Sequence, residues 1–312
     1  MMESLFFLPL VGMVILANYA ERNREAKAIV TVLMLLSSVL LISLGLAVLL
    51  EGSLSELMGA GVQTGFGLAY VMTGAVPLIV LLKGARSRLS RYININPDSV
   101  LHALALYASL GLITFSVTLM LTVEVTMLLE SLELDMVSIV VSGALYALLG
   151  FAGVGLFVRR NLRQSLKRLG IAKPSVKEIV YAIGVSFLLL AVVAIISVIS
   201  VALGLEELGE SDQSMVRLLG GITPFIALVV SLGAGISEEI LFRGALQPRL
   251  GIVFTAFIFA VAHVQYPSMV ALSMVFAAGL VLGWERRVFN TTAAMITHFL
   301  FNFIQLFALS FV

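Results

Sequence analysis

The chain contains no cysteine, and only 12% of its 312 residues are charged. The absence of cysteine excludes disulfides, thiolate metal sites and a cysteine nucleophile. A soluble domain has about twice this share of charged residues. A formal net charge of +1 gives no sign of nucleic-acid binding. Hydrophobic residues make up 60% of the chain, which indicates a membrane protein that crosses the bilayer several times.

Long apolar runs predict the fold class. A helix needs about 20 apolar residues to cross a bilayer, and about ten runs (8–10) approach this length. We expect an all-α, polytopic transmembrane helical bundle with its active site in a cavity inside the membrane. The first run follows only Glu3, so we expect a retained span rather than a signal peptide. The expected spans are 4–20, 28–50, 62–82, 99–123, 136–158, 176–203, 219–247, 250–266, 268–285 and 290–311.

The connections between these runs alternate in charge. All 19 Lys and Arg residues except Arg217 and Arg243 fall in alternate connections or at their edges. The opposite connections carry acids, and because cytoplasmic loops are enriched in basic residues, we expect a multi-pass protein of the cell membrane with both termini outside. These acids include Glu124, Glu130, Glu133, Asp135, Glu206, Glu207, Glu210 and Asp212.

The longest basic connection, Arg159 to Lys173, separates two parts. We expect N-terminal transmembrane helices of unknown role over 1–170 and a catalytic core over 171–312, because the polar residues at membrane depth lie in the second part. Two cap patterns predict helix starts. They are Asn96 before Pro97, and Ser175 with Glu178 three residues later.

Three ionisable residues, Glu238, Glu239 and Arg243, lie within one apolar run. Such residues inside a membrane usually mark function. Glu239 and Arg243 are four apart, which predicts an ion pair on one helix face. Glu238 points about 100° away, so we expect no partner for it on its own helix. It is the candidate general base, and we expect desolvation to raise its pKa.

A depth argument groups Glu238 with three residues of later runs. If the expected helices turn near Arg249 and Phe289, a rise of 1.5 Å per residue puts Glu238 and His263 roughly 16 and 21 Å from the turn. His298 and Asn302 then lie roughly 13 and 20 Å deep. The last two share a helix face, so their donors can converge as an oxyanion hole.

Most residue patterns known for intramembrane proteolysis are absent from this sequence. There is no His-Glu-x-x-His pattern for zinc. The three aspartates, Asp98, Asp135 and Asp212, fall in expected loops or at span edges, so an aspartyl pair at depth is absent. Ser186 is the nearest serine to a rhomboid-like nucleophile, but it precedes Phe187 rather than a small residue.

Three motifs remain. They are Glu238-Glu239-Ile-Leu-Phe-Arg243, Phe259-Ala-Val-Ala-His263 and His298-Phe-Leu-Phe-Asn302, with Gly279 and Gly283 ahead of the last. In this order and spacing the chain resembles the CPBP family of intramembrane endopeptidases, which includes the type II CAAX prenyl proteases. The resemblance covers roughly Leu232 to Gln305.

The resemblance implies a role for each matched residue. Glu238 and His263 would activate a water, His298 and Asn302 would stabilise the oxyanion, and Glu239 and Arg243 would support them. The implied substrate is a membrane-anchored protein or peptide in the bilayer, and its need for a prenyl group stays open. We expect no cofactor. The alternative is zinc held by Glu238, His263 and His298, because a catalytic zinc usually takes three protein ligands.

Two other functions fit the same polar residues. A proton-coupled transporter could relay protons through intramembrane acids and histidines. A non-proteolytic immunity or scaffold protein could keep the fold without the reaction. A transporter often shows broken helices in two related halves, whereas here the polar groups are concentrated in one half.

Overall fold

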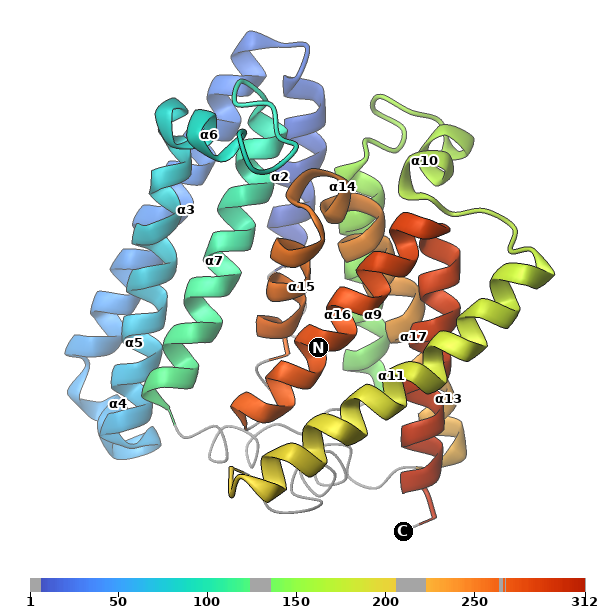
Figure 1. Ribbon diagram of the computed structural model, residues 1–312. Coiled ribbons are helices and arrows are strands. Elements are labelled where there is room, and N and C mark those ends of the chain that lie inside the picture. The colour runs from blue at the N-terminus through green and yellow to red at the C-terminus, as the bar shows by residue number, and fades with distance from the viewer. Residues whose placement is uncertain (1–6, 124–135, 206–222, 264–265, 267, 312) are drawn as a thin grey trace. The chain divides into compact units, whose positions relative to one another are not determined.

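The computed structural model describes residues 7–123, 136–205, 223–263, 266 and 268–311 (Figure 1). Most of these residues are helical, and none of them forms a strand. The described helices of the N-terminal part are α2 (Phe7–Ala20), α3 (Arg24–Leu50), α4 (Gly52–Met58), α5 (Ala60–Ala75), η1 (Val76–Leu81), α6 (Lys83–Leu89) and α7 (Val100–Thr122). The later ones are α9 (Met136–Gly153), α10 (Leu162–Leu169), α11 (Val176–Ala202), α13 (Pro224–Glu239), η2 (Ile240–Leu246), α14 (Gln247–Leu250), α15 (Ile252–Val261), α16 (Met269–Val288) and α17 (Thr291–Leu309).

The all-helical fold class is confirmed, but the expected number of spans is not. Seven helices within the described ranges are long and apolar enough to cross a membrane, which indicates a multi-pass membrane protein. Three expected spans are shorter helices, over Leu8–Ala20, Val137–Gly153 and Ile252–Val261. A ten-residue helix rises only about 15 Å, half of the apolar core of a bilayer. All three helices are shorter than the apolar runs that predicted them, 4–20, 136–158 and 250–266.

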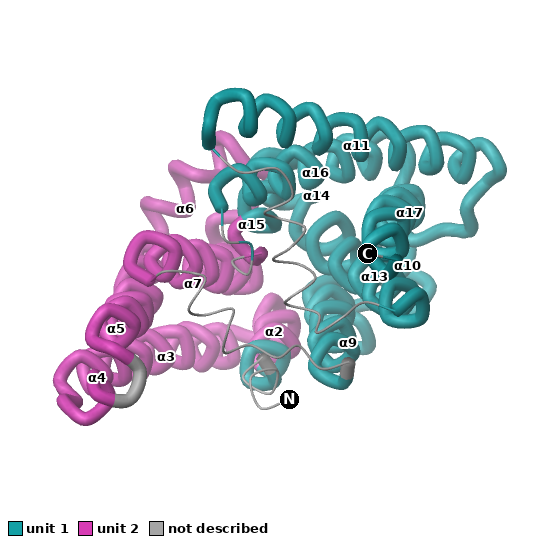
Figure 2. Tube along the Cα trace, turned by 90° about the horizontal axis from the view of Figure 1, so that it is seen from below, with its two compact units in different colours: residues 1–12, 132–260, 266–312 teal, residues 13–131, 261–265 magenta. Residues whose placement is uncertain are grey.

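The chain divides into two compact units (Figure 2). Unit 1 comprises 1–12, 132–260 and 266–312, and unit 2 comprises 13–131 and 261–265. Within unit 2, α3 packs along α5 and α5 along α7. A Cβ at Gly45 would lie 2.6 Å from the carbonyl oxygen of Gly67, so glycines allow α3 and α5 the close approach typical of membrane helices. The functional division expected at residue 170 stays a prediction.

Unit 1 is built around α17. This helix packs against α13, α11 and α16, and α13 also packs against α9. The start of α17 is tied to the segment after α10, because the Thr291 N–H donates to the Gly170 carbonyl at 2.9 Å and the Thr292 hydroxyl donates to the Ala172 carbonyl at 2.9 Å. Gly170 has φ +75°, the left-handed conformation that ends α10.

The two cap predictions had different outcomes. Ser175 caps α11 in the predicted capping box with Glu178. The prediction at Asn96 was wrong, because α7 begins at Val100 with Ser99 as its cap. The Asn96 side chain instead accepts from the backbone N–H of Asp98 at 3.0 Å. Asn and Ser can both cap a helix, so the pattern alone did not select between them.

Two of the acidic connections used to predict orientation, 124–135 and 206–222, lie outside the described residues. They hold the acids Glu124, Glu130, Glu133, Asp135, Glu206, Glu207, Glu210 and Asp212, and also Arg217. The placement of both termini outside the cell stays a prediction.

Candidate active site

The first motif lies where a long helix changes its winding. The helix from Pro224 continues to Leu250, but over Ile240–Leu246 it is wound as a π-helix. The N–H of Gln247 accordingly donates to the carbonyl of Phe242, five residues earlier. Such π segments occur often at functional sites. Here the segment begins directly after Glu239 and contains Arg243.

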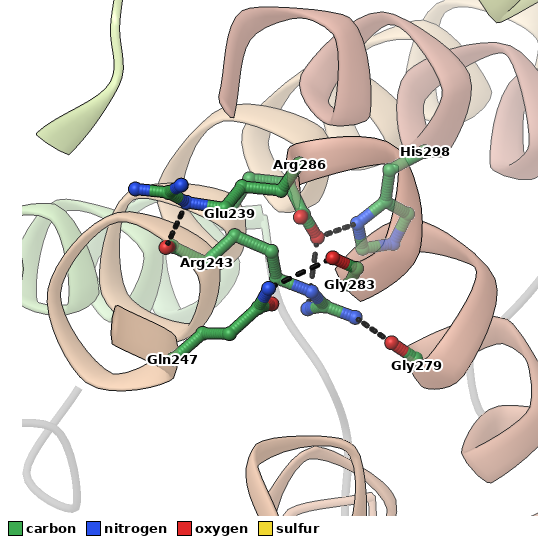
Figure 3. Close-up of polar contacts among 7 residues, drawn as sticks. All are labelled: Glu239, Arg243, Gln247, Gly279, Gly283, Arg286 and His298. Atoms are coloured by element: carbon green, nitrogen blue, oxygen red, sulfur yellow. Dashed lines mark hydrogen bonds and ion pairs between the residues drawn. The ribbon is translucent and has the colours of Figure 1, made fainter. Parts of the chain in front are cut away.

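Glu239 is the centre of a buried polar cluster in unit 1 (Figure 3). Its Oε1 atom lies 3.0 Å from Nη1 of Arg243 and 2.8 Å from Nδ1 of His298. The predicted ion pair with Arg243 is therefore confirmed. The contact with His298 was not expected from the sequence. It joins the first motif on α13 to the third motif on α17.

Arg243 is also fully buried, and two groups besides Glu239 surround it. Its Nη2 donates to the carbonyl of Gly279 at 3.4 Å, and its Cζ lies 4.2 Å from the ring centre of Phe259. A guanidinium over an aromatic face is stabilised by the ring quadrupole. Phe259 thereby brings the second motif into the cluster.

The same phenylalanine also packs against the imidazole. The rings of Phe259 and His298 meet edge to face, with centres 5.9 Å apart. Phe259 meets Phe242 in the same way at 5.2 Å. Residues of all three motifs thus contact one another within unit 1, in a setting where apolar rings exclude water and strengthen the electrostatic interactions.

Two glycines let α16 approach this cluster. A Cβ on Gly279 would lie 3.0 Å from that of Ala256 on α15, and one on Gly283 would lie 2.8 Å from a methyl of Ile252. Both glycines also present carbonyls to η2 and α14, since the Gln247 amide donates to Gly283 at 2.8 Å (Figure 3). Close packing is sufficient reason for glycine at both positions.

Glu238 is half-buried beside the cluster. Its carboxylate acts electrostatically on the phenols of Tyr146 and Tyr266, which the sequence did not single out. Burial raises the pKa of Tyr266, and the charge of Glu238 raises it further. A phenol kept protonated in this way can donate a hydrogen bond to a nearby anion.

The two remaining predicted site residues, Asn302 and His263, belong to different units. Asn302 is half-buried on α17, one turn after His298, and makes no side-chain hydrogen bond within the described part of the chain. His263 lies two residues beyond α15, within 261–265, which belongs to unit 2. The expected helix over 250–266 ends at Val261, and Pro267 disfavours helix at Tyr266. The depth of His263 therefore does not follow from helical rise, and its part in the site stays a prediction.

Glu285 is a buried acid that the sequence analysis did not single out. It has no exposed surface, and the charge of Glu239 acts on it. The sequence does contain a pattern that indicates this burial. Ala278, Leu282 and Glu285 recur at helical spacing, so Glu285 continues the buried face of α16, whereas its neighbour Trp284 is 48% exposed.

No three His, Asp or Glu side chains among the described residues gather closely enough to hold a metal ion. His298 would have to use Nε2 as a ligand, because its Nδ1 contacts Glu239. The zinc alternative with Glu238, His263 and His298 stays open, since His263 belongs to the other unit.

Comparison with known families adds one match. Residues 220–304 match the family model of the type II CAAX prenyl endopeptidases, Rce1-like. The matched stretch contains all three motifs and the whole Glu239 cluster, which agrees with the resemblance predicted from them. It implies a protease of the CAAX type. Residues before 220 lie outside the match, and no curated protein and no solved structure matches the chain.

Proposed function

We propose that the chain is an intramembrane endopeptidase that hydrolyses a peptide bond near the C-terminus of a membrane-associated, prenylated protein. The observation that carries the proposal is the buried contact between Glu239 and His298. It unites two motifs inside the stretch that matches the prenyl endopeptidases. A charged cluster with no exposed surface is costly in a membrane protein, so a function is the best reason for its presence.

In the proposed mechanism, Glu238 and His263 remove a proton from a water, which attacks the carbonyl carbon of the scissile bond. His298 and Asn302 donate hydrogen bonds to the oxyanion that forms. The proton taken from the water then passes to the leaving amine, as general acid–base catalysis requires. Glu239 and Arg243 do not contact the substrate and act by orienting His298.

The Glu239 contact limits the protonation state of His298. A carboxylate paired with Arg243 can only accept hydrogen bonds, so Nδ1 of the imidazole donates one to Glu239. His298 can then donate from Nε2 only as an imidazolium. A cationic donor beside an oxyanion stabilises it more strongly than a neutral one.

The same geometry favours a second role for His298. If the ring is neutral, Nδ1 carries the proton and Nε2 is a base, as in a carboxylate–histidine pair that activates a nucleophile. His298 would then activate the water with Glu239 as its orienting group, and Glu238 would be the proton donor. Both assignments give the same reaction, hydrolysis of a peptide bond. They differ in which substitution should reduce activity most.

The experiment that tests the function uses purified full-length chain in a bilayer with farnesylated and unmodified C-terminal peptides. We expect cleavage of the farnesylated peptide, and we expect Glu238→Gln or His263→Ala to abolish it while the variants melt as the parent does. Unchanged turnover in either variant contradicts the first assignment. If no peptide is cleaved but a pH gradient drives uptake of a solute, the chain is a transporter.

Treatment with a chelator decides the zinc alternative in the same assay. Full activity in chelator-treated protein whose metal content is below one equivalent supports a metal-free reaction. Loss of activity that added zinc restores supports zinc.

A further inference from the structure

A cluster of five arginines lies in unit 1, outside the Glu239 cluster. It comes from the turn before α10, from α10 itself, and from the ends of η2–α14 and of α16. All five side chains are half-buried, and the charges of the other four act on Arg168. The members of this arginine cluster are Arg159, Arg160, Arg168, Arg249 and Arg286.

Carbonyls of the π segment hold two of these guanidiniums in place. Arg168 donates to the carbonyl of Gly244 at 3.2 Å, and Arg286 donates to the carbonyl of Arg243 at 3.1 Å (Figure 3). These carbonyls lie four and five residues before Pro248, which has no N–H to donate to either of them. The end of the π segment therefore presents two adjacent carbonyl acceptors, and each accepts a hydrogen bond from an arginine.

The two anchored arginines lie near each other. A Cβ at Gly170, which directly follows α10, would lie 3.6 Å from Nη2 of Arg286. The backbone after α10 thus reaches the end of α16. Arg168, two residues before Gly170, shares its anchoring segment with Arg286. Each guanidinium has five N–H donors, so both keep donors beyond those used on the backbone.

Four members of the cluster have no acidic partner within the described part of the chain. Arg160, Arg168, Arg249 and Arg286 take part in none of its ion pairs. Burial, with a further contribution from the neighbouring arginines, lowers the pKa of Arg168 to about 10. Like charges are thus held close together in a partly buried place. A bound anion would reduce the repulsion between them.

An exposed apolar tip adjoins the cluster and indicates where the anion comes from. Phe157 is 83% exposed and has φ +58°, an unusual conformation for a bulky residue. Its N–H donates to the carbonyl of Arg160 at 2.8 Å, so the turn holds an aromatic side chain outward beside two arginines. Val158 is exposed as well. Apolar side chains next to basic ones are typical of a membrane–water interface.

We propose that the arginine cluster binds the phosphate headgroup of an anionic membrane lipid, with Phe157 and Val158 against its acyl chains. A soluble phosphate would satisfy the charges but would leave these apolar side chains exposed. The segment also belongs to the basic connection predicted to face the cytoplasmic leaflet, which is rich in anionic lipid. The lipid would tie α10, α14 and α16 together at one end of unit 1.

Binding is measured by native mass spectrometry of the full chain in neutral detergent. The protein is titrated with phosphatidylglycerol, with phosphatidylcholine of the same acyl chains, and with inorganic phosphate. We expect retention of phosphatidylglycerol alone. Arg249→Gln should weaken its binding about fivefold, the usual effect of one basic residue at a membrane surface, and Arg168→Gln should weaken it at least as much.

The chain offers matched controls. Arg163 is exposed on the same α10 and is not among the charges acting on Arg168, so Arg163→Gln should bind as the parent does. Arg249→Gln leaves both carbonyl anchors intact and keeps the test valid if Arg168→Gln misfolds. Arg168→Lys, which keeps the charge, should restore most of the binding.

Three results would overturn the proposal. The first is equal retention of phosphatidylcholine, and the second is equal loss in Arg163→Gln and Arg249→Gln. The third is inorganic phosphate displacing the lipid at matched concentration, because the cluster would then bind a free anion. If Arg249→Gln leaves lipid binding unchanged but raises KM for a peptide with a free C-terminal carboxylate over its amidated form, the cluster binds substrate instead.

Discussion

The Nδ1 atom of His298 lies 2.8 Å from Oε1 of Glu239, a residue 59 positions earlier in the chain. The same oxygen lies 3.0 Å from Arg243. One buried carboxylate oxygen is therefore shared by a guanidinium and an imidazole from two different helices. This oxygen contributes both to the stability of the fold and to the proposed hydrolysis. Variants of Glu239 distinguish the two contributions.

Glu239→Gln should destabilise the protein, because it leaves Arg243 buried without its counter-charge. Breaking a buried ion pair in this way costs about 3–5 kcal/mol. Thermal unfolding in detergent measures the loss, with Glu238→Gln as the neighbouring control. If Glu239→Gln instead abolishes cleavage at an unaltered melting temperature, the roles of the two glutamates have to be exchanged.

Asn302→Ala should lower kcat by about 10²- to 10³-fold with little change in KM, the usual effect of removing one oxyanion donor. Gln305→Ala is the control on the same helix, since the Gln305 amide donates to the Phe301 carbonyl within α17. An equal loss in both variants would point to damage of α17 rather than to a missing donor.

Gly235→Ala should destabilise by about 1–3 kcal/mol, the usual cost of overpacking. A Cβ there would lie 2.9 Å from the backbone nitrogen of Phe299 on α17 and 3.1 Å from the carbonyl of Met295, neither of which can move alone. Gly233 has nothing within 4 Å of the same position. Gly233→Ala should therefore be neutral or stabilise by up to about 1 kcal/mol. Equal melting temperatures would contradict the close approach of α13 and α17.

Ser186→Ala should leave cleavage within about twofold of the parent, because its hydroxyl is buried and donates to the Ala182 carbonyl at 2.7 Å and the Thr297 carbonyl at 3.3 Å. A nucleophilic serine needs a base within hydrogen-bond reach, and these partners are carbonyls. Initial rates with the farnesylated peptide measure the effect. Complete loss of turnover in a folded variant would revive the serine-protease reading.

Local features of the sequence predicted local features of the structure. The spacing of Glu239 and Arg243 predicted their ion pair, because four residues make about one helical turn. Ser175 and Glu178 predicted the start of α11 in the same way. Both arrangements depend on backbone geometry over a few residues and on nothing else in the fold.

Contacts between helices could not be predicted in this way. Two polar residues at similar depth can face each other or face apart, so depth grouped His298 with Glu238, whereas its hydrogen bond is to Glu239. The burial of Glu285 depends on the packing of α16, and its charged neighbours concealed the apolar period. The end of α15 at Val261 also falls inside a continuous apolar run, where composition does not change.

The winding of η2 decides which of two adjacent acids meets α17. Each residue turns an α-helix by about 100°, and the wider turn over Ile240–Leu246 shifts everything before it relative to Leu250. Removing one residue from this segment would restore the ordinary helical repeat and rotate Glu239 away from His298. The extra backbone of the π segment therefore sets the rotation of α13 relative to α17.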